Sequence, residues 1–206
     1  MFDLVLGTGN RHKVIELRGM LPAHEFRLVC LADLPAAIDV NETGSTFADN
    51  ACLKAGEQAV NLGRWVLAED SGLCVDALDG RPGVHSARFA GKHGDDEANN
   101  RLLISQMLGV VTGNRGAAFH THIAVADPTG RIVLQSHGHC RGVIAGEPSG
   151  DGGFGYDPLF VIPEYHLTFA QLGIAVKNVL SHRSRALRAI LPGLRQLARQ
   201  HATGGR

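Results

Sequence analysis

The fold of this chain is decided by the stretch Trp65-Val66-Leu67-Ala68-Glu69-Asp70-Ser71-Gly72, an apolar run that ends in two adjacent acids and a Ser-Gly pair. The pattern predicts a buried strand over residues 65 to 69, followed by a loop. Carboxylates on a rigid strand end are the hard oxygen ligands that magnesium prefers. Because successive strand side chains point to opposite faces, one metal ion is not expected to contact both acids, and Asp70 is favoured over Glu69.

A strand, a turn and a helix are predicted at the start of the chain. Residues 3 to 7 read as a buried strand, residues 8 to 13 as a loop, and residues 14 to 21 as helical. A glycine-containing loop before a helix presents N–H groups and a positive dipole end to an anion, while Asn10 and Lys13 add donors. The spacing is not that of a P-loop, so an ordinary solvated turn remains the alternative.

The remaining pattern also alternates strands and helices. Thr46 and Asp49 have capping-box spacing, and Gly63 is a helix stop. The other expected elements are a strand at 26–31, a turn-rich segment at 33–43, a strand or turn at 73–78, a helix at 97–108, a hairpin of 117–126 with 131–141, a Gly-rich connection at 142–155, a strand at 159–162, a terminal helix at 183–200 interrupted or restarted at Pro192, and a frayed end at 202–206. The pattern indicates an α/β protein.

Composition limits the classes of partner. The 206 residues include 20 basic and 20 acidic ones, so net charge zero gives no general attraction to nucleic acid or to an anionic membrane. The start lacks a basic signal region, and no apolar run reaches the roughly 18 residues of a membrane span, so a cytoplasmic protein is expected. The four cysteines form no CxxC pair, which indicates reduced thiols.

Carboxylates provide the candidate metal ligands. Glu42 lies near the end of the turn-rich segment, and Glu69 and Asp70 are adjacent. Neighbouring negative charges repel unless a cation or water separates them, and Mg²⁺ relieves that repulsion. A solvated acidic corner is the alternative. Ser71 has no His and Asp partners in nucleophile-elbow spacing, so it is not read as a covalent nucleophile.

A candidate base-binding region lies in the C-terminal third. Phe154 stands between glycines, where an aromatic ring can stack on a purine and Asp157 can bond the base edge or sugar. Lys177 and the run Ser181-His182-Arg183 form a basic cluster that can donate to a base carbonyl, as in inosine or xanthine, and would reject the amino group of adenine. A tight turn and a solvated helix cap are the alternatives.

Four histidines on the predicted hairpin raise the hypothesis of a transition-metal site. His120 and His122 share one strand face, as do His137 and His139. Alternating polar residues on the exposed face of a hairpin explain them more simply, and phosphate chemistry prefers oxygen-bound magnesium.

Five segments taken together resemble the XTP/dITP pyrophosphatase family, also called inosine triphosphate pyrophosphatases. They are TGNRHKVIEL at 8–17, ETGSTFADNACLKA at 42–55, AEDSGLCVDALDGRPGVHSARFAG at 68–91, GFGYDPLF at 153–160 and KNVLSHRSRAL at 177–187. They span nearly the whole chain in the family's order. The resemblance implies hydrolysis of non-standard purine nucleoside triphosphates to monophosphate and pyrophosphate.

The same resemblance implies a fold and a set of site residues. The fold is one domain over residues 1–206: an elongated mixed β-sheet flanked by helices, in two lobes with a nucleotide cleft between them, typically as a homodimer. Glu42 and Asp70 would bind Mg²⁺, and Asp70 would also accept a proton. The residues implied to contact the substrate are Thr8, Gly9, Asn10, Arg11, His12, Lys13, Ser71, Phe154, Gly155, Tyr156, Asp157, Lys177, His182 and Arg183.

Two other functions fit the same residues. The first is a pyrophosphatase for ordinary or pyrimidine triphosphates, as in Maf-like proteins. The second is a nucleotide-binding sensor without turnover, although the presence of both Glu42 and Asp70 favours an enzyme.

Overall fold

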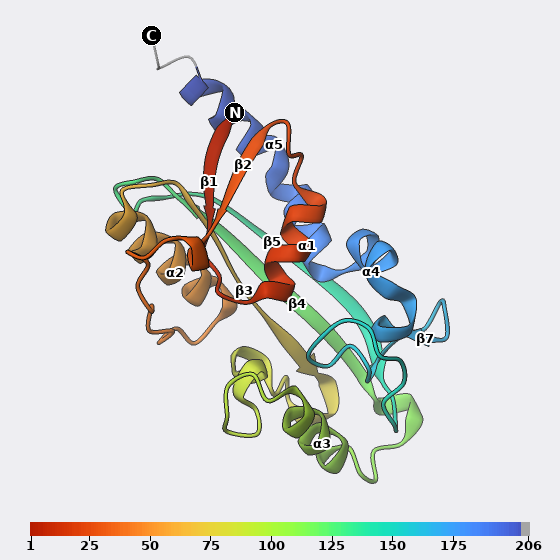
Figure 1. Ribbon diagram of the computed structural model, residues 1–206. Helices are drawn as coiled ribbons and strands as arrows, with labels where there is room; N and C mark the ends of the chain where they lie inside the picture. The colour runs from red at the N-terminus through yellow and green to blue at the C-terminus, as the bar shows by residue number, and fades with distance from the viewer. Residues whose placement is uncertain (203–206) are drawn as a thin grey trace. The chain divides into compact units, whose positions relative to one another are not determined.

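A computed structural model describes residues 1–202 of the chain (Figure 1). Seven strands form one sheet in the order β2-β1-β3-β4-β5-β6-β7. The strands are β1 (Phe2–Leu6), β2 (Phe26–Cys30), β3 (Val66–Val75), β4 (Gly116–Ala126), β5 (Ile132–Ile144), β6 (Phe160–Ile162) and β7 (Leu167–Thr168). The α-helices are α1 (Arg11–Met20), α2 (Phe47–Leu62), α3 (Asp96–Gln106), α4 (Phe169–Leu180) and α5 (His182–Ala202). Strand β1 is parallel to β2 and β3, whereas β6 is antiparallel to β5 and β7, so the predicted mixed α/β class is confirmed.

The described residues form two compact units. Unit 1 contains Met1–Asp70, Thr121–Gly138 and residues 183–202, and unit 2 contains Ser71–His120 and His139–His182. Strands β3, β4 and β5 therefore contribute residues to both units. The nucleotide cleft stays a prediction.

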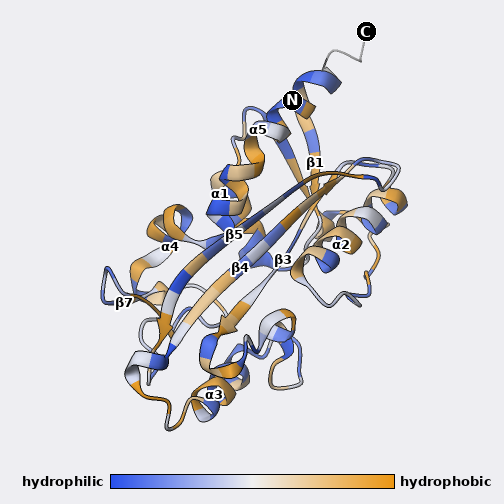
Figure 2. Ribbon diagram, turned by 180° about the vertical axis from the view of Figure 1, so that it is seen from behind, coloured by the Kyte–Doolittle hydropathy of each residue, from blue (hydrophilic) through white to orange (hydrophobic). Residues whose placement is uncertain are grey.

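Unit 1 is layered, with helices on both faces of its strands. On β1, the side chains of Phe2, Leu4 and Leu6 lie in one apolar cluster with residues of α1 and α5. Val5, which points the other way, lies in a second cluster with α2. Helix α2 contributes only alanines to the buried part of that cluster, and their small side chains allow close packing on the sheet. Figures 1 and 2 show α2 on one side of these strands and α1 and α5 on the other.

The ends of α2 agree with the sequence prediction. The Thr46 hydroxyl accepts a hydrogen bond from the Asp49 N–H, and the Asp49 carboxylate accepts one from the Thr46 N–H, both at 3.1 Å. Gly63 ends the helix with a left-handed φ of 60°. The predicted capping box and glycine stop are confirmed.

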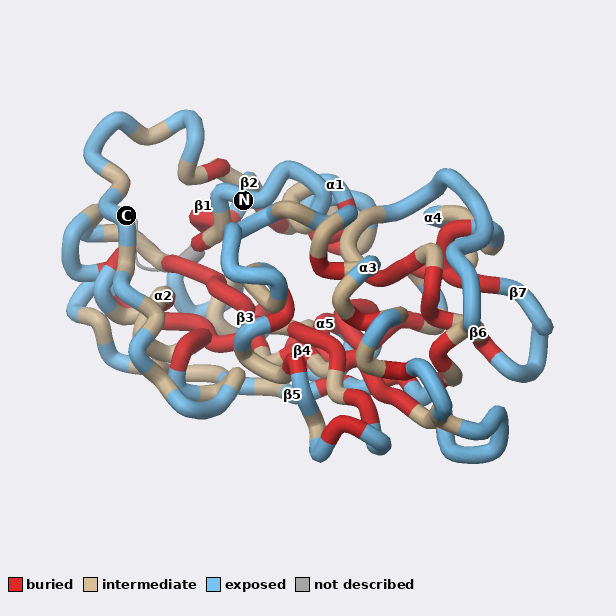
Figure 3. Tube along the Cα trace, turned by 90° about the horizontal axis from the view of Figure 1, so that it is seen from below, coloured by how far each residue is buried: buried red, intermediate tan, exposed pale blue. Residues whose placement is uncertain are grey.

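Unit 2 has its own aromatic core. The ring centroids of Phe119 and Phe160 lie 4.6 Å apart, and those of Phe160 and Phe169 lie 5.3 Å apart. Leu103 and Met107 of α3 lie in the same cluster. Figure 3 shows that buried residues follow the strands, while exposed residues dominate the loops.

Strand β3 differs from its prediction, because it continues through Ser71 and Gly72 to Val75 instead of ending at Glu69. The reason is burial in unit 2, where Leu73 and Val75 are fully enclosed in the aromatic cluster. The expectation of a loop after Asp70 was wrong. The Gly-rich connection also begins later than predicted, because β5 continues to Ile144.

Three helices also differ from their predictions. Helix α1 begins at Arg11, so the last three residues of the predicted loop form its first turn. Helix α4 was not predicted; it begins at a capping box made by Thr168 and Gln171. Helix α5 runs without interruption through Pro192, although an interior proline costs about 3 kcal/mol. Burial of Ile190 and Leu194 on either side offsets that cost. Residues 203–206 of the predicted frayed end lie outside the described residues.

Two further features are the state of the cysteines and the composition of the helices. All four cysteines are free thiols, and Cys30 and Cys140 are buried, in agreement with the predicted reduced state. Among residues 1–202, no helix has the length and apolar composition needed to cross a bilayer.

The predicted hairpin of β4 and β5 is confirmed, and Asp127 organises its turn. Its Oδ1 accepts hydrogen bonds from the Thr129 hydroxyl at 2.6 Å and N–H at 2.9 Å, while its Oδ2 accepts one from the Arg131 Nε at 3.1 Å. These bonds, led by that of the Thr129 hydroxyl, lower the pKa of Asp127 to about 2.

Asp127→Asn is expected to destabilise the protein at pH 5 and to do so much less at pH 2. A carboxyl whose folded-state pKa is depressed contributes stability above its ordinary pKa of 3.8, and loses that contribution as the pH falls through about 2. Urea unfolding of the wild type and the variant at both pH values measures the difference. An equal difference at pH 5 and pH 2 would show that the charge of Asp127 adds nothing.

Candidate active site

The loop between β1 and α1 is held on the sheet and leads into the positive end of a helix. The Gly7 N–H donates to the Leu67 carbonyl of β3 at 2.7 Å. A Cβ at Gly7 would lie 2.9 Å from that of Ala68, so a side chain would push the loop away. Asn10 caps α1, since its Oδ1 accepts from the N–H groups of His12 at 2.9 Å and Lys13 at 3.3 Å. Gly9 has open space beside it.

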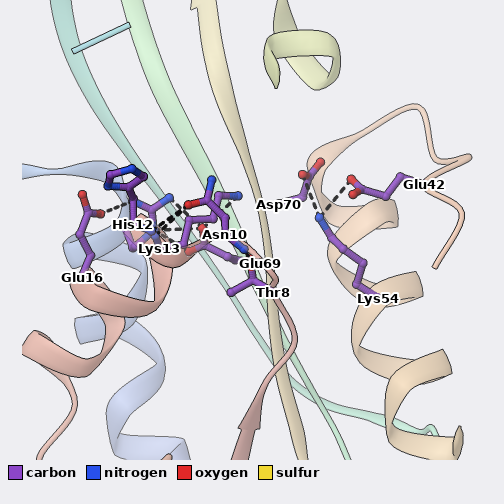
Figure 4. Close-up of polar contacts among 10 residues, drawn as sticks. Thr8, Asn10, His12, Lys13, Glu16, Glu42, Lys54, Glu69 and Asp70 are labelled. Atoms are coloured by element: carbon purple, nitrogen blue, oxygen red, sulfur yellow. Dashed lines mark hydrogen bonds and ion pairs between the residues drawn. The ribbon is translucent and has the colours of Figure 1, made fainter. Parts of the chain in front are cut away.

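A buried ion-pair network lies below this loop. The Arg183 guanidinium donates to Glu69 through Nε and Nη2, both at 2.7 Å, and also pairs with Glu16. The Lys13 Nζ lies 3.2 Å from Glu69 Oε1 (Figure 4). Two cations and two carboxylates therefore balance within unit 1.

The pKa shifts in this network follow from burial and charge. Burial lowers the pKa of Lys13, and Glu69 acts against that effect. Burial also works against the charge of Arg183, but Glu69 and Glu16 raise its pKa above the ordinary value. Glu69 thus stabilises two cations, and through Lys13 it is linked to the end of the loop of residues 8 to 13.

The two predicted magnesium ligands converge on one lysine. The Lys54 Nζ lies 3.0 Å from Glu42 Oε2 and 3.1 Å from Asp70 Oδ1. Figure 4 shows Lys54 between the two carboxylates, while Glu69 lies on the other side of β3. The two adjacent acids therefore have different partners, in agreement with the predicted alternation of the strand.

Asn50 connects Asp70 with the segment that carries Glu42. Its Nδ2 donates to Asp70 Oδ2 at 3.2 Å, and its Oδ1 accepts from the Gly44 N–H at 2.8 Å. Asn50 and Lys54 are four residues apart, so they lie on the same face of α2. Sequence reasoning missed both residues; their spacing within the predicted helix was the available signal.

The donor set is compatible with magnesium. Within residues 1–202, no group of three or more His, Cys, Asp or Glu side chains is placed to hold a metal. Two carboxylates that meet at one positive charge nevertheless suit Mg²⁺, which usually takes one or two protein carboxylates and completes its shell with water and phosphate oxygens.

In unit 2, the predicted base-binding residues form a compact group. Asp157 Oδ2 accepts hydrogen bonds from the Phe154 N–H at 2.9 Å and from the Lys177 Nζ at 2.5 Å. The Lys177 Nζ lies 4.4 Å from the centroid of the Phe154 ring, a cation–π distance. Gly153 has a φ of 76°, and a Cβ there would lie 2.1 Å from Asp157 Oδ2, so only glycine fits.

Other predicted contact residues are buried. The Tyr156 hydroxyl donates to the Ser86 carbonyl at 2.9 Å. The His182 ring stacks on Phe119 with centroids 4.8 Å apart. Ser71 is partly buried within β3.

The predicted basic cluster of Lys177, His182 and Arg183 is divided among different partners. Lys177 pairs with Asp157, His182 stacks on an aromatic ring, and Arg183 pairs with buried acids of unit 1. The alternative of solvated basic side chains at a helix cap is wrong, because all three side chains are buried and have partners distant in sequence. The predicted contact of these residues with a base stays a prediction.

His120, His122 and His139 of the hairpin have contacts with residues of the partner strand. The rings of His120 and His139 stack with centroids 5.9 Å apart. A ring nitrogen of His122 lies 3.0 Å from Gln135 Oε1. In the part of the chain that the structure describes, these histidines belong to no group of three or more His, Cys, Asp or Glu side chains placed to hold a metal.

Comparison with known proteins gives a consistent result. The family model described as Ham1 family matches residues 4–192. A protein of Rhodopirellula baltica named dITP/XTP pyrophosphatase is 58% identical, with 98% of each chain covered. A solved HAM1 protein of Coxiella burnetii is 36% identical with a TM-score of 0.85, covering 95% of this chain and 100% of that one. A solved nucleoside-triphosphatase / dITP/XTP pyrophosphatase of Mycobacterium abscessus is 43% identical with a TM-score of 0.74, covering 93% and 100%. The chain belongs to the Ham1 family.

Proposed function

We propose that this protein hydrolyses non-standard purine nucleoside triphosphates, namely ITP, dITP and XTP, to the monophosphate and pyrophosphate. Such an activity keeps deaminated purines out of DNA and RNA. The names of the similar proteins support it. The observation that carries the proposal is the adjacency of the anion-binding loop and the acids. Strands β1 and β3 are parallel, and Leu6 pairs with Leu67, so the loop after β1 lies next to Glu69 and Asp70.

We assign the triphosphate to the residues of unit 1. Thr8 to Lys13 would bind phosphate oxygens with backbone N–H groups, the positive end of α1 and the Lys13 ammonium. Glu42 and Asp70 would hold Mg²⁺, which supplies positive charge to phosphate oxygens as they gain charge in the reaction. Lys54, between these two carboxylates, adds a further positive charge at the same place.

Asp70 is the proposed proton acceptor. A water molecule attacks the α-phosphorus, the bond from that phosphorus to the bridging oxygen breaks, and pyrophosphate leaves. The proton of the attacking water passes to an Asp70 oxygen. Asn50 and Lys54 hold the two oxygens of this carboxylate, which orients it before the substrate arrives.

We assign the base to the residues of unit 2. Phe154 offers a stacking surface worth roughly 1 to 3 kcal/mol per base. Lys177, held by Asp157, is a donor that suits the 6-carbonyl of hypoxanthine or xanthine and not the amino group of adenine. Ser71, Gly155, Tyr156, His182 and Arg183 stay in the proposed set, with the last three supporting the site from buried positions.

We also propose that the enzyme is cytoplasmic and acts as a homodimer. Free thiols suit a reducing compartment, and the dimer is implied by the family resemblance. Light scattering after size exclusion is expected to give twice the mass of the chain; the mass of a single chain would contradict the dimer.

A pyrophosphate-release assay tests the function. The panel is ITP, dITP, XTP, ATP, GTP and dTTP at alkaline pH, with and without Mg²⁺. The expected result is Mg²⁺-dependent release with kcat/KM for ITP, dITP and XTP about 100-fold above that for ATP or more, because polar recognition of a base edge discriminates strongly. Preference for dTTP would favour a Maf-like activity, and binding without release would favour a sensor.

A further inference from the structure

Helix α3 forms two hydrogen bonds with the backbone of the loop that carries Phe154 and Asp157. The Gly155 N–H donates to Asp96 Oδ2 at 2.7 Å. The Gly155 carbonyl accepts from Asn100 Nδ2 at 2.9 Å. Asp96 and Asn100 are four residues apart in the first two turns of α3, so both project from the same helix face. One helix thus engages both polar groups of a single peptide position.

Gly155 lies between two residues of the loop that have contacts of their own. Gly155 follows Phe154 directly and has a φ of 61°, a conformation that side chains rarely allow. On its other side, Tyr156 is anchored through its hydroxyl to the Ser86 carbonyl. Burial and, to a smaller extent, the Asp96 carboxylate raise the pKa of Tyr156.

Asn100 maintains its contact at an energetic cost. Its Oδ1 is buried and has no hydrogen-bond partner among the described residues. Because the Gly155 carbonyl needs a donor, the amide is oriented with its Nδ2 toward the loop and its oxygen away from water. A leucine would avoid the unpaired side-chain oxygen, but it would remove the donor of the Gly155 carbonyl. The amide at this position is therefore explained by what it does at Gly155.

We propose that Asp96 and Asn100 are positioning residues for base recognition, which hold Gly155 so that Phe154 and the Asp157–Lys177 pair are correctly placed for the purine. This inference rests on the proposed nucleotide function. Neither residue contacts the base; both act through the loop backbone. Their loss therefore weakens binding of the base and leaves phosphate binding by the residues of unit 1 unchanged.

Product binding separates these two contributions without requiring turnover. Calorimetry measures the Kd of inosine monophosphate and of inorganic pyrophosphate for the wild type, Asp96→Ala, Asn100→Ala and Asp96→Asn. Glu97→Ala is the matched control, because Glu97 lies in the same turn of α3 but is exposed, and its carboxylate pairs with the exposed Arg101. Wild-type release of pyrophosphate from ITP is measured in parallel.

Asp96→Ala and Asn100→Ala are expected to raise the Kd of inosine monophosphate about 10- to 100-fold, since small displacements of a binding group have effects of this size. Pyrophosphate affinity stays within about 2-fold of the wild type, and the preference for ITP over ATP falls. Asp96→Asn keeps an oxygen acceptor for the Gly155 N–H, so it is expected to restore most of the affinity.

Two results would overturn the inference. Unchanged affinity for inosine monophosphate would show that the loop keeps its place without α3. An equal loss of affinity for inosine monophosphate and for pyrophosphate, including in Asp96→Asn, would indicate a general loss of structure. Both leave the proposed function standing if the wild type hydrolyses ITP, whereas a wild type that neither hydrolyses ITP nor binds the monophosphate would refute the proposed function itself.

Discussion

Asp70→Asn is expected to lower kcat for ITP by about 10²- to 10⁴-fold, the usual contribution of a general base. The carboxylate is in position for this role because Lys54 and Asn50 contact its two oxygens at 3.1 and 3.2 Å. Asparagine has nearly the same shape and keeps one oxygen, but it cannot take up the proton of the attacking water. Nucleotide affinity should change much less than kcat, because the loop of Thr8 to Lys13 and the residues proposed to bind the base are untouched.

Single-turnover kinetics at saturating Mg²⁺ measures this effect apart from weaker metal binding. Glu57→Gln is the control, since it makes the same chemical change at an exposed position of α2. If Asp70→Asn turns over ITP at close to the wild-type rate, Asp70 does not take part in the chemical step. A loss that disappears when Mg²⁺ is raised would leave Asp70 as a metal ligand alone.

Local signals made several elements predictable from the sequence. Helix α2 carries its own start in Thr46 and Asp49 and its own stop in Gly63. The β4–β5 hairpin carries its turn in Asp127 to Gly130, where the aspartate side chain satisfies nearby N–H groups. In both cases, residues within a few positions of one another determine the backbone.

The extent of β3 and the existence of α4 depend on partners that are distant in sequence. Ser71 and Gly72 read as a loop, yet burial of Leu73 and Val75 in unit 2 keeps the strand extended. Helix α4 contains Gly173, whose φ of 75° and ψ of 171° are not helical. Phe169 packs in the aromatic cluster of unit 2 and so helps to hold the helix despite this local weakness.

The candidate site shows the same division. The acids, the loop of Thr8 to Lys13 and the glycines around Phe154 stand in short motifs, so sequence alone indicated them. Lys54, Asn50 and Asn100 look like ordinary helix residues, and only the folded chain shows what each contacts. The pairing of Arg183 with Glu69 joins residues 114 positions apart, which no local pattern can reveal.

Arg183→Met is expected to lower the free energy of unfolding by about 3 to 5 kcal/mol, the usual effect of removing one partner from a buried ion pair. Arg183 is 1% exposed, and its guanidinium pairs with Glu69 and Glu16, which are also buried. Methionine fills part of the volume but leaves two carboxylates in a poorly solvated place. Urea unfolding measures the change, and Arg18→Met on the exposed face of α1 is the control, expected to shift stability by less than about 0.5 kcal/mol.

A double variant identifies the cause of the loss. Adding Glu69→Gln to Arg183→Met removes one uncompensated charge, so part of the lost stability should return. Only the double variant removes the partner of Lys13, because Glu69 lies 3.2 Å from its ammonium, so phosphate affinity should be lower in the double variant than in Arg183→Met. If Arg183→Met instead unfolds like the wild type and loses only nucleotide binding, Arg183 acts as a substrate contact and the buried network contributes little to the fold.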